Sequence, residues 1–591
     1  MAGDYADPGG PRQRHFAWRR AAGGIMVCFM KPRIFTTLLV FLTLPLLGEE
    51  TAETGPEPRL PSVAEAIPAS VKNLGKPTIT NFPYGIRMAV TADNEDVQAE
   101  VLQGLNHLHG GWEFEASRHF AQAMEQDPGC LLAHWGMVMC LLNPTPETIP
   151  VKNAAVSRML ELIEKGNGSE LERGYAYGLV KYLEEGPAGA TVAFRKVAEK
   201  FPNDLQATVF AALFGRGGYD AMGDPTPDQE VSEKMLLELI KKHPQSPIPL
   251  NALLAIRAES RNLLESVEMA RGLCKMLPDY PPAFHLLGHY EWRCGHHAAA
   301  ATAFGRASSF YQRWMNDNKV TVADCPEWVR SECYRIVALV SKGDFETAYA
   351  AARHVAATPL PLKRLSSAGA RCLLWEAKTL PARVLLHRGF KGNADEAKLS
   401  LPTPKESEVT RKESLANWWI DGLRIALEAR RLIDVGDLDG ARIALSALTQ
   451  HGEMMSHTQR DAARFGERSE WTRAFRALEV LASDTRGTLA MAGPTDKRET
   501  AYNWFASAMD RQQPATMLNP PMLLTPMASH LGGFYLATKK PEEAIEAYQR
   551  ALEMFPNDMN SLVGLKSAFE AAGKSKDAEN IGKRIEELKA N

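Results

Sequence analysis

Residues 525–558 read TPMASHLGGFYLATKKPEEAIEAYQRALEMFPND, and this stretch decides the fold. It has glycine at its eighth position, alanine at its twentieth, an aromatic residue at its twenty-fourth and proline at its thirty-second. The Gly–Ala–aromatic spacing recurs in windows that start at 97, 171 and 281, as Gly104/Ala116/Phe120, Gly178/Ala190/Phe194 and Gly288/Ala300/Phe304. Chance would give this triple at about one position in two thousand, so four copies indicate a repeat.

The spacing predicts two antiparallel helices in each unit. Small residues at the eighth and twentieth positions let the two helices approach closely, and the aromatic residue fills the space toward the next pair. Glycine at the fifteenth position, as at Gly111 and Gly295, ends the first helix in a left-handed conformation. Proline at the thirty-second position ends the second helix. One pair cannot bury its apolar face but a stack can, so we expect an all-α solenoid of antiparallel helix pairs.

A targeting segment precedes the repeats. Residues 34–47, IFTTLLVFLTLPLL, form an apolar run after Lys31 and Arg33 and before Gly48. This pattern is typical of a secretory signal peptide, and the run is shorter than the roughly 20 residues that a membrane-spanning helix needs. We therefore expect a periplasmic or extracellular protein with no membrane span after signal cleavage. The alternative is an uncleaved signal anchor that holds the chain in the inner membrane.

The chain divides into five predicted segments. Residues 1–48 are an amino-terminal extension and signal peptide, with translation starting at Met26 or Met30, and residues 49–94 are a linker and irregular lead-in. Apolar residues then recur with helical spacing almost without interruption. We predict helical arrays over 95–360 and 416–591, separated by an irregular or degenerate helical segment over 361–415.

Composition and motifs exclude several functions. The 591 residues include 68 Lys+Arg and 71 Asp+Glu, for a formal net charge of −3, and 45% are hydrophobic. These values are ordinary for a globular chain, and the near-neutral charge argues against a nucleic-acid partner, which needs a basic face. The sequence has no HExxH, paired CxxC or GxSxG motif, and no GxGxxG follows a strand. We therefore predict no enzyme and no cofactor.

The cysteines give a weaker prediction. Seven remain after the predicted cleavage, and this odd number leaves at least one thiol free or paired with another chain. Most lie in apolar helical runs, where buried free thiols are expected. Cys325 and Cys333 are the only pair that we consider for a disulfide, because Cys325 lies in a predicted loop.

The repeat resembles the tetratricopeptide repeat over about 95–591. The chain is also similar to a poorly characterised family of exported bacterial tetratricopeptide-repeat proteins, through residues 104–137 (GLNHLHGGWEFEASRHFAQAMEQDPGCLLAHWGM), 284–295 (FHLLGHYEWRCG) and 519–526 (NPPMLLTP) with the repeat that follows. This resemblance implies a right-handed superhelix with a concave groove. It also implies a non-enzymatic scaffold that binds a protein or peptide there, after export into the bacterial envelope.

The resemblance also implies which residues line the groove, because positions 2, 5, 9, 12 and 13 of the first helix face the concave surface in such arrays. In the 281 unit these positions give Pro282, His285, His289, Trp292 and Arg293. The two histidines lie four residues apart on one helix face, so they could share a metal ion, or grip a carboxylate together with Arg293. Ordinary packing inside the fold is the other interpretation of both histidines.

Other units extend the predicted groove with the residues His109, Trp135, Tyr175 and Tyr182. An aromatic and partly cationic groove suits extended peptides. The sequence thus predicts a protein or peptide ligand in the concave groove. The alternative is a small-ligand or metal site at His285 and His289, and the oligomeric state stays open.

Overall fold

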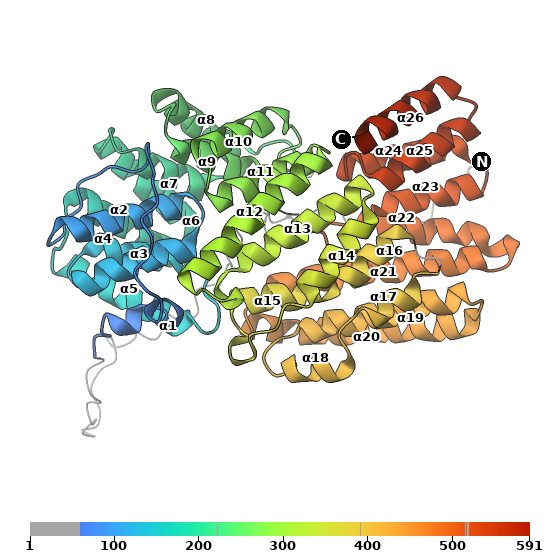
Figure 1. Cartoon of the computed structure of the whole chain (residues 1–591), viewed down its shortest axis with the longest axis horizontal. Coiled ribbons are helices and arrows are strands. Elements are labelled where there is room, and N and C mark those ends of the chain that lie inside the picture. The colour runs from blue at the N-terminus through green and yellow to red at the C-terminus, as the bar shows by residue number, and fades with distance from the viewer. Residues whose placement is uncertain (1–58, 221–222, 390–391, 514–515, 517–518, 591) are drawn as a thin grey trace, which may run out of the picture.

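The computed structural model describes residues 59–220, 223–389, 392–513, 516 and 519–590. Throughout these ranges the elements are helices joined by turns, with no β-strand beyond an isolated bridge between Tyr219 and Pro225. The predicted all-α solenoid of antiparallel helix pairs is confirmed, and it runs from the amino-terminal helices at one end of Figure 1 to the carboxy-terminal helices at the other. The predicted signal peptide within 1–48 and the first residues of the 49–94 linker lie outside the described residues.

The amino-terminal part of the solenoid begins with an irregular lead-in and continues as paired helices. α6 reverses direction at Gly186, whose φ is 74°, so it supplies both helices of its pair. The elements are η2 (Ala64–Ala66), α1 (Ala69–Lys72), α2 (Glu95–His109), α3 (Glu113–Gln126), α4 (Leu131–Cys140), α5 (Ile149–Glu164), α6 (Glu170–Lys200), α7 (Leu205–Gly215), α8 (Pro227–Lys242), α9 (Pro247–Arg257), α10 (Leu264–Met276), α11 (Pro281–Arg293), α12 (His297–Asn318), η3 (Val322–Asp324), α13 (Pro326–Lys342) and α14 (Phe345–Ala356).

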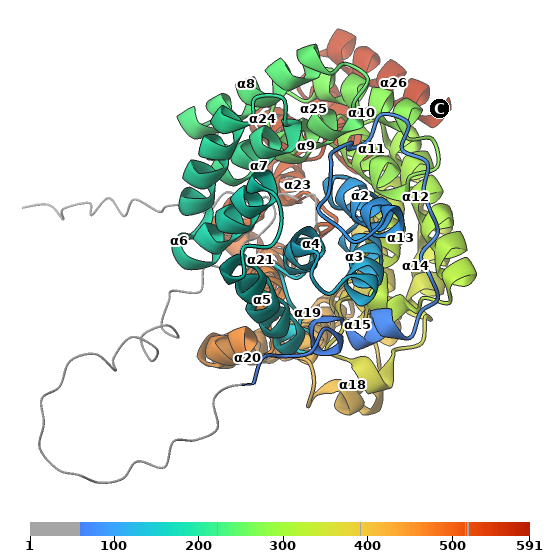
Figure 2. The ribbon, with the colours of Figure 1, turned by 90° about the vertical axis from the view of Figure 1, so that its left-hand side faces the viewer.

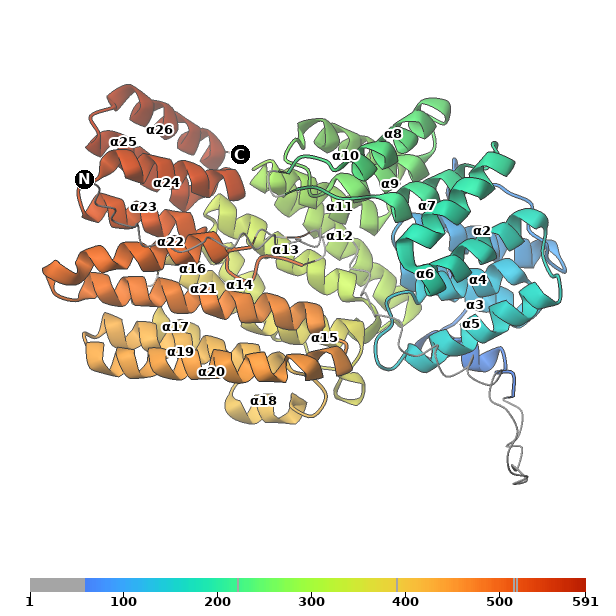
Figure 3. The ribbon, with the colours of Figure 1, turned by 180° about the vertical axis from the view of Figure 1, so that it is seen from behind.

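Short helices follow, and then long paired helices resume. The short elements are η4 (Leu362–Arg364), α15 (Ala368–Trp375), η5 (Ala377–Thr379), α16 (Leu380–Arg388), α17 (Ala394–Leu399) and α18 (Pro404–Thr410). The later elements, stacked in order in Figure 3, are α19 (Ala416–Asp434), α20 (Leu438–Arg464), α21 (Arg468–Ala492), η6 (Thr495–Thr500), α22 (Ala501–Arg511), α23 (Met527–Ala537), α24 (Pro541–Met554), α25 (Met559–Ala571) and α26 (Ser575–Ala590).

The repeat spacing has a direct physical explanation in the packing of glycine against an aromatic ring. A Cβ atom added to Gly288 would lie 2.7 Å from the Phe304 ring, and the same contact joins glycine to the aromatic ring in the other three units. The Phe120 ring also fills the space beside Gly136 of α4, which belongs to the next pair. The aromatic residue therefore packs within its own pair and against the next one, as the spacing predicts.

The solenoid curls until distant pairs touch. α2 contacts α9, and α13 contacts α25. In the end-on view of Figure 2, helices α5 to α14 form an arc around α2, α3 and α4. The Tyr280 hydroxyl before α11 reaches His107 of α2, with 3.3 Å between the hydroxyl oxygen and Nδ1. This closure removes much of the open inner surface that a more extended solenoid would present.

The lead-in is fixed to the solenoid although it forms little regular structure. Gln103 of α2 accepts a hydrogen bond from the amide of Thr80 and donates one to the Thr80 carbonyl, at 3.0 and 2.9 Å. The Asn106 side chain accepts a bond of 2.7 Å from the amide of Ile86. These side chains take the place of strand partners for the lead-in backbone.

The structure corrects the disulfide that the sequence analysis considered. Cys325 and Cys333 are both free and buried, as are Cys130, Cys274 and Cys372. Cys325 caps the start of α13 and Cys333 lies eight residues along it. Eight residues rise about 12 Å along a helix, too far for a disulfide bond. Burial also raises the pKa of both thiols well above the usual value.

No helix among the described residues is both long enough and apolar enough to cross a membrane.

Candidate functional site

The inner face of the solenoid is the candidate site, and it is more enclosed than the sequence predicts. Of the eight His, Arg and aromatic residues expected to line an open groove, only His285 and Arg293 keep part of their surface exposed. The other six are buried and contact neighbouring helices: His109, Trp135, Tyr175, Tyr182, His289 and Trp292. Their placement in an open groove is therefore corrected, because the curled solenoid brings its own helices onto the inner face.

Four of these residues gather in the first turns of the solenoid. His109 and Trp135 pack against the Phe210 ring of α7, with ring centres 4.8 and 5.5 Å apart. Trp135 also donates a hydrogen bond of 3.0 Å to the main-chain carbonyl of Tyr175. Tyr182 packs against Phe214 one turn further along α7. This aromatic cluster joins successive pairs and functions as core.

The 281 unit brings its predicted residues together around Tyr334 of α13. The ring centres of His285, His289 and Trp292 lie 5.9, 5.6 and 6.1 Å from the Tyr334 ring, in edge contacts. Phe304 stacks on the other side at 5.1 Å, with 13° between the ring planes. The sequence analysis did not include Tyr334, the residue on which this constellation converges.

The two histidines have different surroundings. Nδ1 of His285 lies 2.9 Å from the Ser331 hydroxyl oxygen. His289 is fully buried, and neither of its ring nitrogens has a hydrogen-bond partner. Burial, with smaller contributions from the charges of Arg293 and His285, holds the pKa of His289 well below its usual value. His289 is therefore neutral near pH 7.

Arg293 is held by the end of α9. Its guanidinium donates a hydrogen bond of 3.1 Å to the Ala258 carbonyl and lies 3.5 Å from the Glu259 carboxylate. Among the described residues, no group of three or more His, Cys, Asp and Glu side chains is arranged to hold a metal ion.

An irregular segment of the chain itself, residues 519–526, lies on the inner face. The Tyr334 hydroxyl donates a hydrogen bond of 2.8 Å to the carbonyl of Asn519 and also contacts the carbonyl of Thr516. Further along, Met522, Leu523 and Leu524 are buried. Leu524 joins the apolar cluster around α11 and α13, whereas the other two join the cluster around α19 and α21. Residues 519–526 thus connect two parts of the solenoid from inside.

Two arginines hold the prolines of this segment. Arg473 of α21 donates a hydrogen bond of 2.5 Å to the Pro520 carbonyl, and Arg383 of α16 donates one of 2.6 Å to the Pro521 carbonyl. The two oxygens of the buried Glu376 carboxylate bond the same arginines, at 2.7 and 3.2 Å. Because proline has no amide hydrogen, its carbonyl is its only main-chain hydrogen-bonding group. The donors therefore match what a Pro-Pro segment offers.

The polar contacts of this arrangement go to the backbone of the segment. Tyr334, Arg383 and Arg473 come from three helices, and each donates to a main-chain carbonyl. Sequence reasoning missed them because Arg383 lies in the segment without a clear period, and Tyr334 and Arg473 fall outside the expected groove positions. The sequence feature that could have pointed to this site is residues 519–526, a proline-containing stretch that is too long for a turn between two repeat helices.

The fold places the protein in the class of solenoids built from antiparallel helix pairs. Its inner face holds residues 519–526 of the same chain. Within that class, residues 527–558 match the family model described as the tetratricopeptide repeat. These residues are α23 and α24, which belong to the most regular unit in the sequence. No curated protein matches the chain significantly.

Solved structures of tetratricopeptide proteins give distant matches. The TPR domain of P58(IPK) is 15% identical, with 81% of this chain and 99% of that chain covered and a TM-score of 0.19. Yeast Tom70 is 11% identical, with coverages of 84% and 93% and a TM-score of 0.23. A monomeric mutant of IFIT1 with Gppp-AAAA is 11% identical, with coverages of 84% and 92% and a TM-score of 0.28. Matches at these values carry no argument about a shared ligand.

Proposed function

We propose that this protein is a non-enzymatic scaffold that binds a protein partner after export into the bacterial envelope. One observation carries the proposal: three helices of the inner face hold residues 519–521 of the chain itself through their main-chain carbonyls. Tyr334, Arg383 and Arg473 supply the donors. Stacked repeats of this type present large surfaces built from many pairs, which suits binding of another protein chain.

The proposed location rests on the sequence alone. The apolar run 34–47 with Lys31 and Arg33 before it supports export through a signal peptide. The intact mass of protein recovered from the native envelope tests this proposal. A mass that begins shortly after Gly48 supports cleavage, and a mass that retains residues 34–47 supports the alternative of an uncleaved anchor.

The scaffold is tested by affinity capture from native cells, using the full chain with a carboxy-terminal tag and mass spectrometry of the bound material. We expect one protein enriched over a tag-only control. A second bait, H285A/R293A, changes two predicted groove residues that remain partly exposed. Loss of the partner at an unchanged melting temperature would place it on the inner face, whereas its retention would place it elsewhere on the solenoid. Recovery of no protein above the control would overturn the scaffold.

A further inference from the structure

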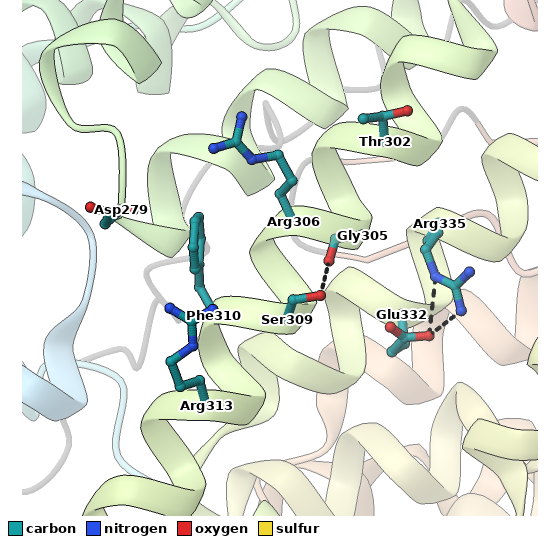
Figure 4. A pocket seen from close by; sticks show the side chains of 9 residues that line it. All are labelled: Asp279, Thr302, Gly305, Arg306, Ser309, Phe310, Arg313, Glu332 and Arg335. Atoms are coloured by element: carbon teal, nitrogen blue, oxygen red, sulfur yellow. Dashed lines mark hydrogen bonds and ion pairs between the residues drawn. The ribbon is translucent and has the colours of Figure 1, made fainter.

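A depression lies on the surface over α12. Its volume is about 680 Å³, and Figure 4 shows it between the loop before α11, the outer face of α12 and the neighbouring helix α13. Arg306, Phe310 and Arg313 lie along α12, with Asp279 at one rim and Arg335 at the other. It lies apart from the inner-face residues that hold the 519–526 segment.

The two arginines of α12 carry positive charge that no carboxylate neutralises. Arg306 and Arg313 make no ion pair or hydrogen bond with any residue that the structure describes. Arg335, by contrast, is bound by the Glu332 carboxylate at 2.7 and 3.2 Å. Glu332 also accepts a hydrogen bond of 2.5 Å from Ser308, so its carboxylate is already bound by two side chains of the same chain. Asp279 is the one other acidic side chain in the lining.

Aromatic rings hold these guanidinium groups in place. The Arg306 guanidinium lies 4.2 Å from the centre of the Phe284 ring and 5.8 Å from that of Phe310. Arg313 lies 5.8 Å from the Phe310 ring centre. Stacking keeps a planar guanidinium oriented and leaves its edge free for a carboxylate. Less conformational entropy is then lost when an anion binds.

The spacing of the two charges restricts the ligand. Arg306 and Arg313 lie seven residues apart, two helical turns and about 10.5 Å along α12. A polyproline II segment places residues i and i+3 on one face, about 9.3 Å apart. Two glutamates at i and i+3 therefore match the spacing of the two arginine positions, and two intervening prolines would favour the polyproline II conformation.

We propose that the Arg306–Phe310–Arg313 surface docks an acidic, proline-containing segment of a protein partner, with carboxylates at positions i and i+3 in a polyproline II conformation. This inference rests on the proposed scaffold function and names the chemistry of its partner. Two charges at a fixed spacing, with an apolar ring between them, together supply specificity that a single arginine would lack.

Fluorescence anisotropy of a labelled Gly-Ser-Glu-Pro-Pro-Glu-Ser-Gly peptide with the full chain tests the proposal. We expect R306Q/R313Q to weaken binding at least about tenfold, with an unchanged melting temperature. R195Q/K196Q is the matched control, because it removes the same charge from an exposed part of α6. D279N is expected to strengthen binding, because it removes the opposing charge at the rim.

Three results would overturn the proposal that this surface docks an acidic segment. They are equal binding of the Gln-Pro-Pro-Gln peptide, equal binding by R306Q/R313Q, and tighter binding of a single-stranded oligonucleotide. Capture from native cells separates this inference from the scaffold itself. If the R306Q/R313Q bait retains the same partner as the wild type, this surface is wrong and the scaffold stands. If the wild-type bait captures nothing, the scaffold is wrong, whatever the peptide does.

Discussion

The side-chain amide of Asn557 donates a hydrogen bond of 3.0 Å to the main-chain carbonyl of Gly295, 262 positions earlier in the chain. Arg584 of α26 donates in turn to the Asn557 side-chain oxygen, from Nε at 2.8 Å and from Nη2 at 2.5 Å. Near this bond, the Phe555 ring packs on Trp292. The end of the last strong repeat is thereby joined to the turn between α11 and α12.

The Asn557 contact leads to a graded stability prediction. Asn557 has a φ of 60°, which glycine adopts without strain and alanine does not. Asn557→Gly should lower the melting temperature because the Gly295 carbonyl loses its partner, at a cost of about 1–3 kcal/mol. Asn557→Ala should lower it further, because backbone strain adds about 1 kcal/mol. Thermal unfolding followed by circular dichroism measures both, and a more stable alanine variant would contradict this account.

Two glycines in helices test the packing behind the repeat. Gly288→Ala places a Cβ 2.7 Å from the Phe304 ring and should cost about 1–3 kcal/mol through overpacking. Gly272 of α10 is the matched control, because nothing lies within 4 Å of its added Cβ. Gly272→Ala should leave stability unchanged or raise it by up to about 1 kcal/mol through helix propensity. Equal shifts in melting temperature for the two variants would show that close packing of Gly288 against Phe304 does not contribute to stability.

Removal of one hydroxyl tests how residues 519–526 are held. Tyr334→Phe keeps the ring stacked on Phe304 but leaves the carbonyls of Asn519 and Thr516 without this donor. We expect faster cleavage between 512 and 526 in limited proteolysis, located by mass spectrometry. Tyr548→Phe is the control, because the Tyr548 ring packs beside Gly532 and the variant keeps that ring. Unchanged cleavage in the Tyr334 variant would mean that the apolar contacts alone hold the segment.

Buried histidines predict a loss of stability in mild acid. Burial lowers the pKa of His109, His134 and His297 to about 4, whereas an unfolded histidine titrates near 6.5. Between these values the unfolded chain binds more protons, so the free energy of unfolding falls as pH falls from about 6.5 to about 4. Each of the three should contribute about 1.4 kcal/mol of this loss by pH 5.5. Above about pH 7 they contribute no pH dependence.

Buried carboxyls oppose this trend. Burial raises the pKa of Glu327 to about 7, so its contribution to stability decreases as pH rises toward 7, and burial also raises the pKa of Asp204 and Glu467. Since burial lowers the pKa of His107, His289 and His387 as well, the histidines outnumber these carboxyls and the net loss on acidification should remain. Melting temperatures between pH 7.5 and 5 measure it, with His109→Asn as the test variant. This variant should be less stable at pH 7 but lose less on acidification, and a flat profile for the wild type would contradict the prediction.

The fold was predictable where the contacts that stabilise it are local in sequence. Gly288 and Phe304 lie sixteen residues apart in one helix pair, and their contact produces the period that the sequence shows. The short helices α15 to α18 have no such period, because their residues contact distant parts of the chain. Arg383 is an example, since its partner carbonyl at Pro521 lies 138 positions away.

The candidate site was predicted only in part, for a related reason. The sequence placed His285 and His289 on one face of α11, and both do contact the same residue, Tyr334. Their exposure could not be predicted, because it depends on how far the solenoid curls. Curling is the sum of small rotations at every pair, and no single pair reveals that Gly295 will meet Asn557. Residues 519–526 are likewise held by side chains distant in sequence, Tyr334, Arg383 and Arg473.

The bond between Asn557 and Gly295 also bears on how the protein is made. Ribosomes add about 5–20 residues per second, so the turn after α11 emerges roughly 13–50 seconds before its partner is synthesised. During that interval the inner side of α11 and α13 lacks both Asn557 and residues 519–526, and its apolar side chains stay uncovered. The packing of the middle of the chain is therefore complete only after the last quarter has been synthesised. Export before folding would delay this packing until the whole chain is present.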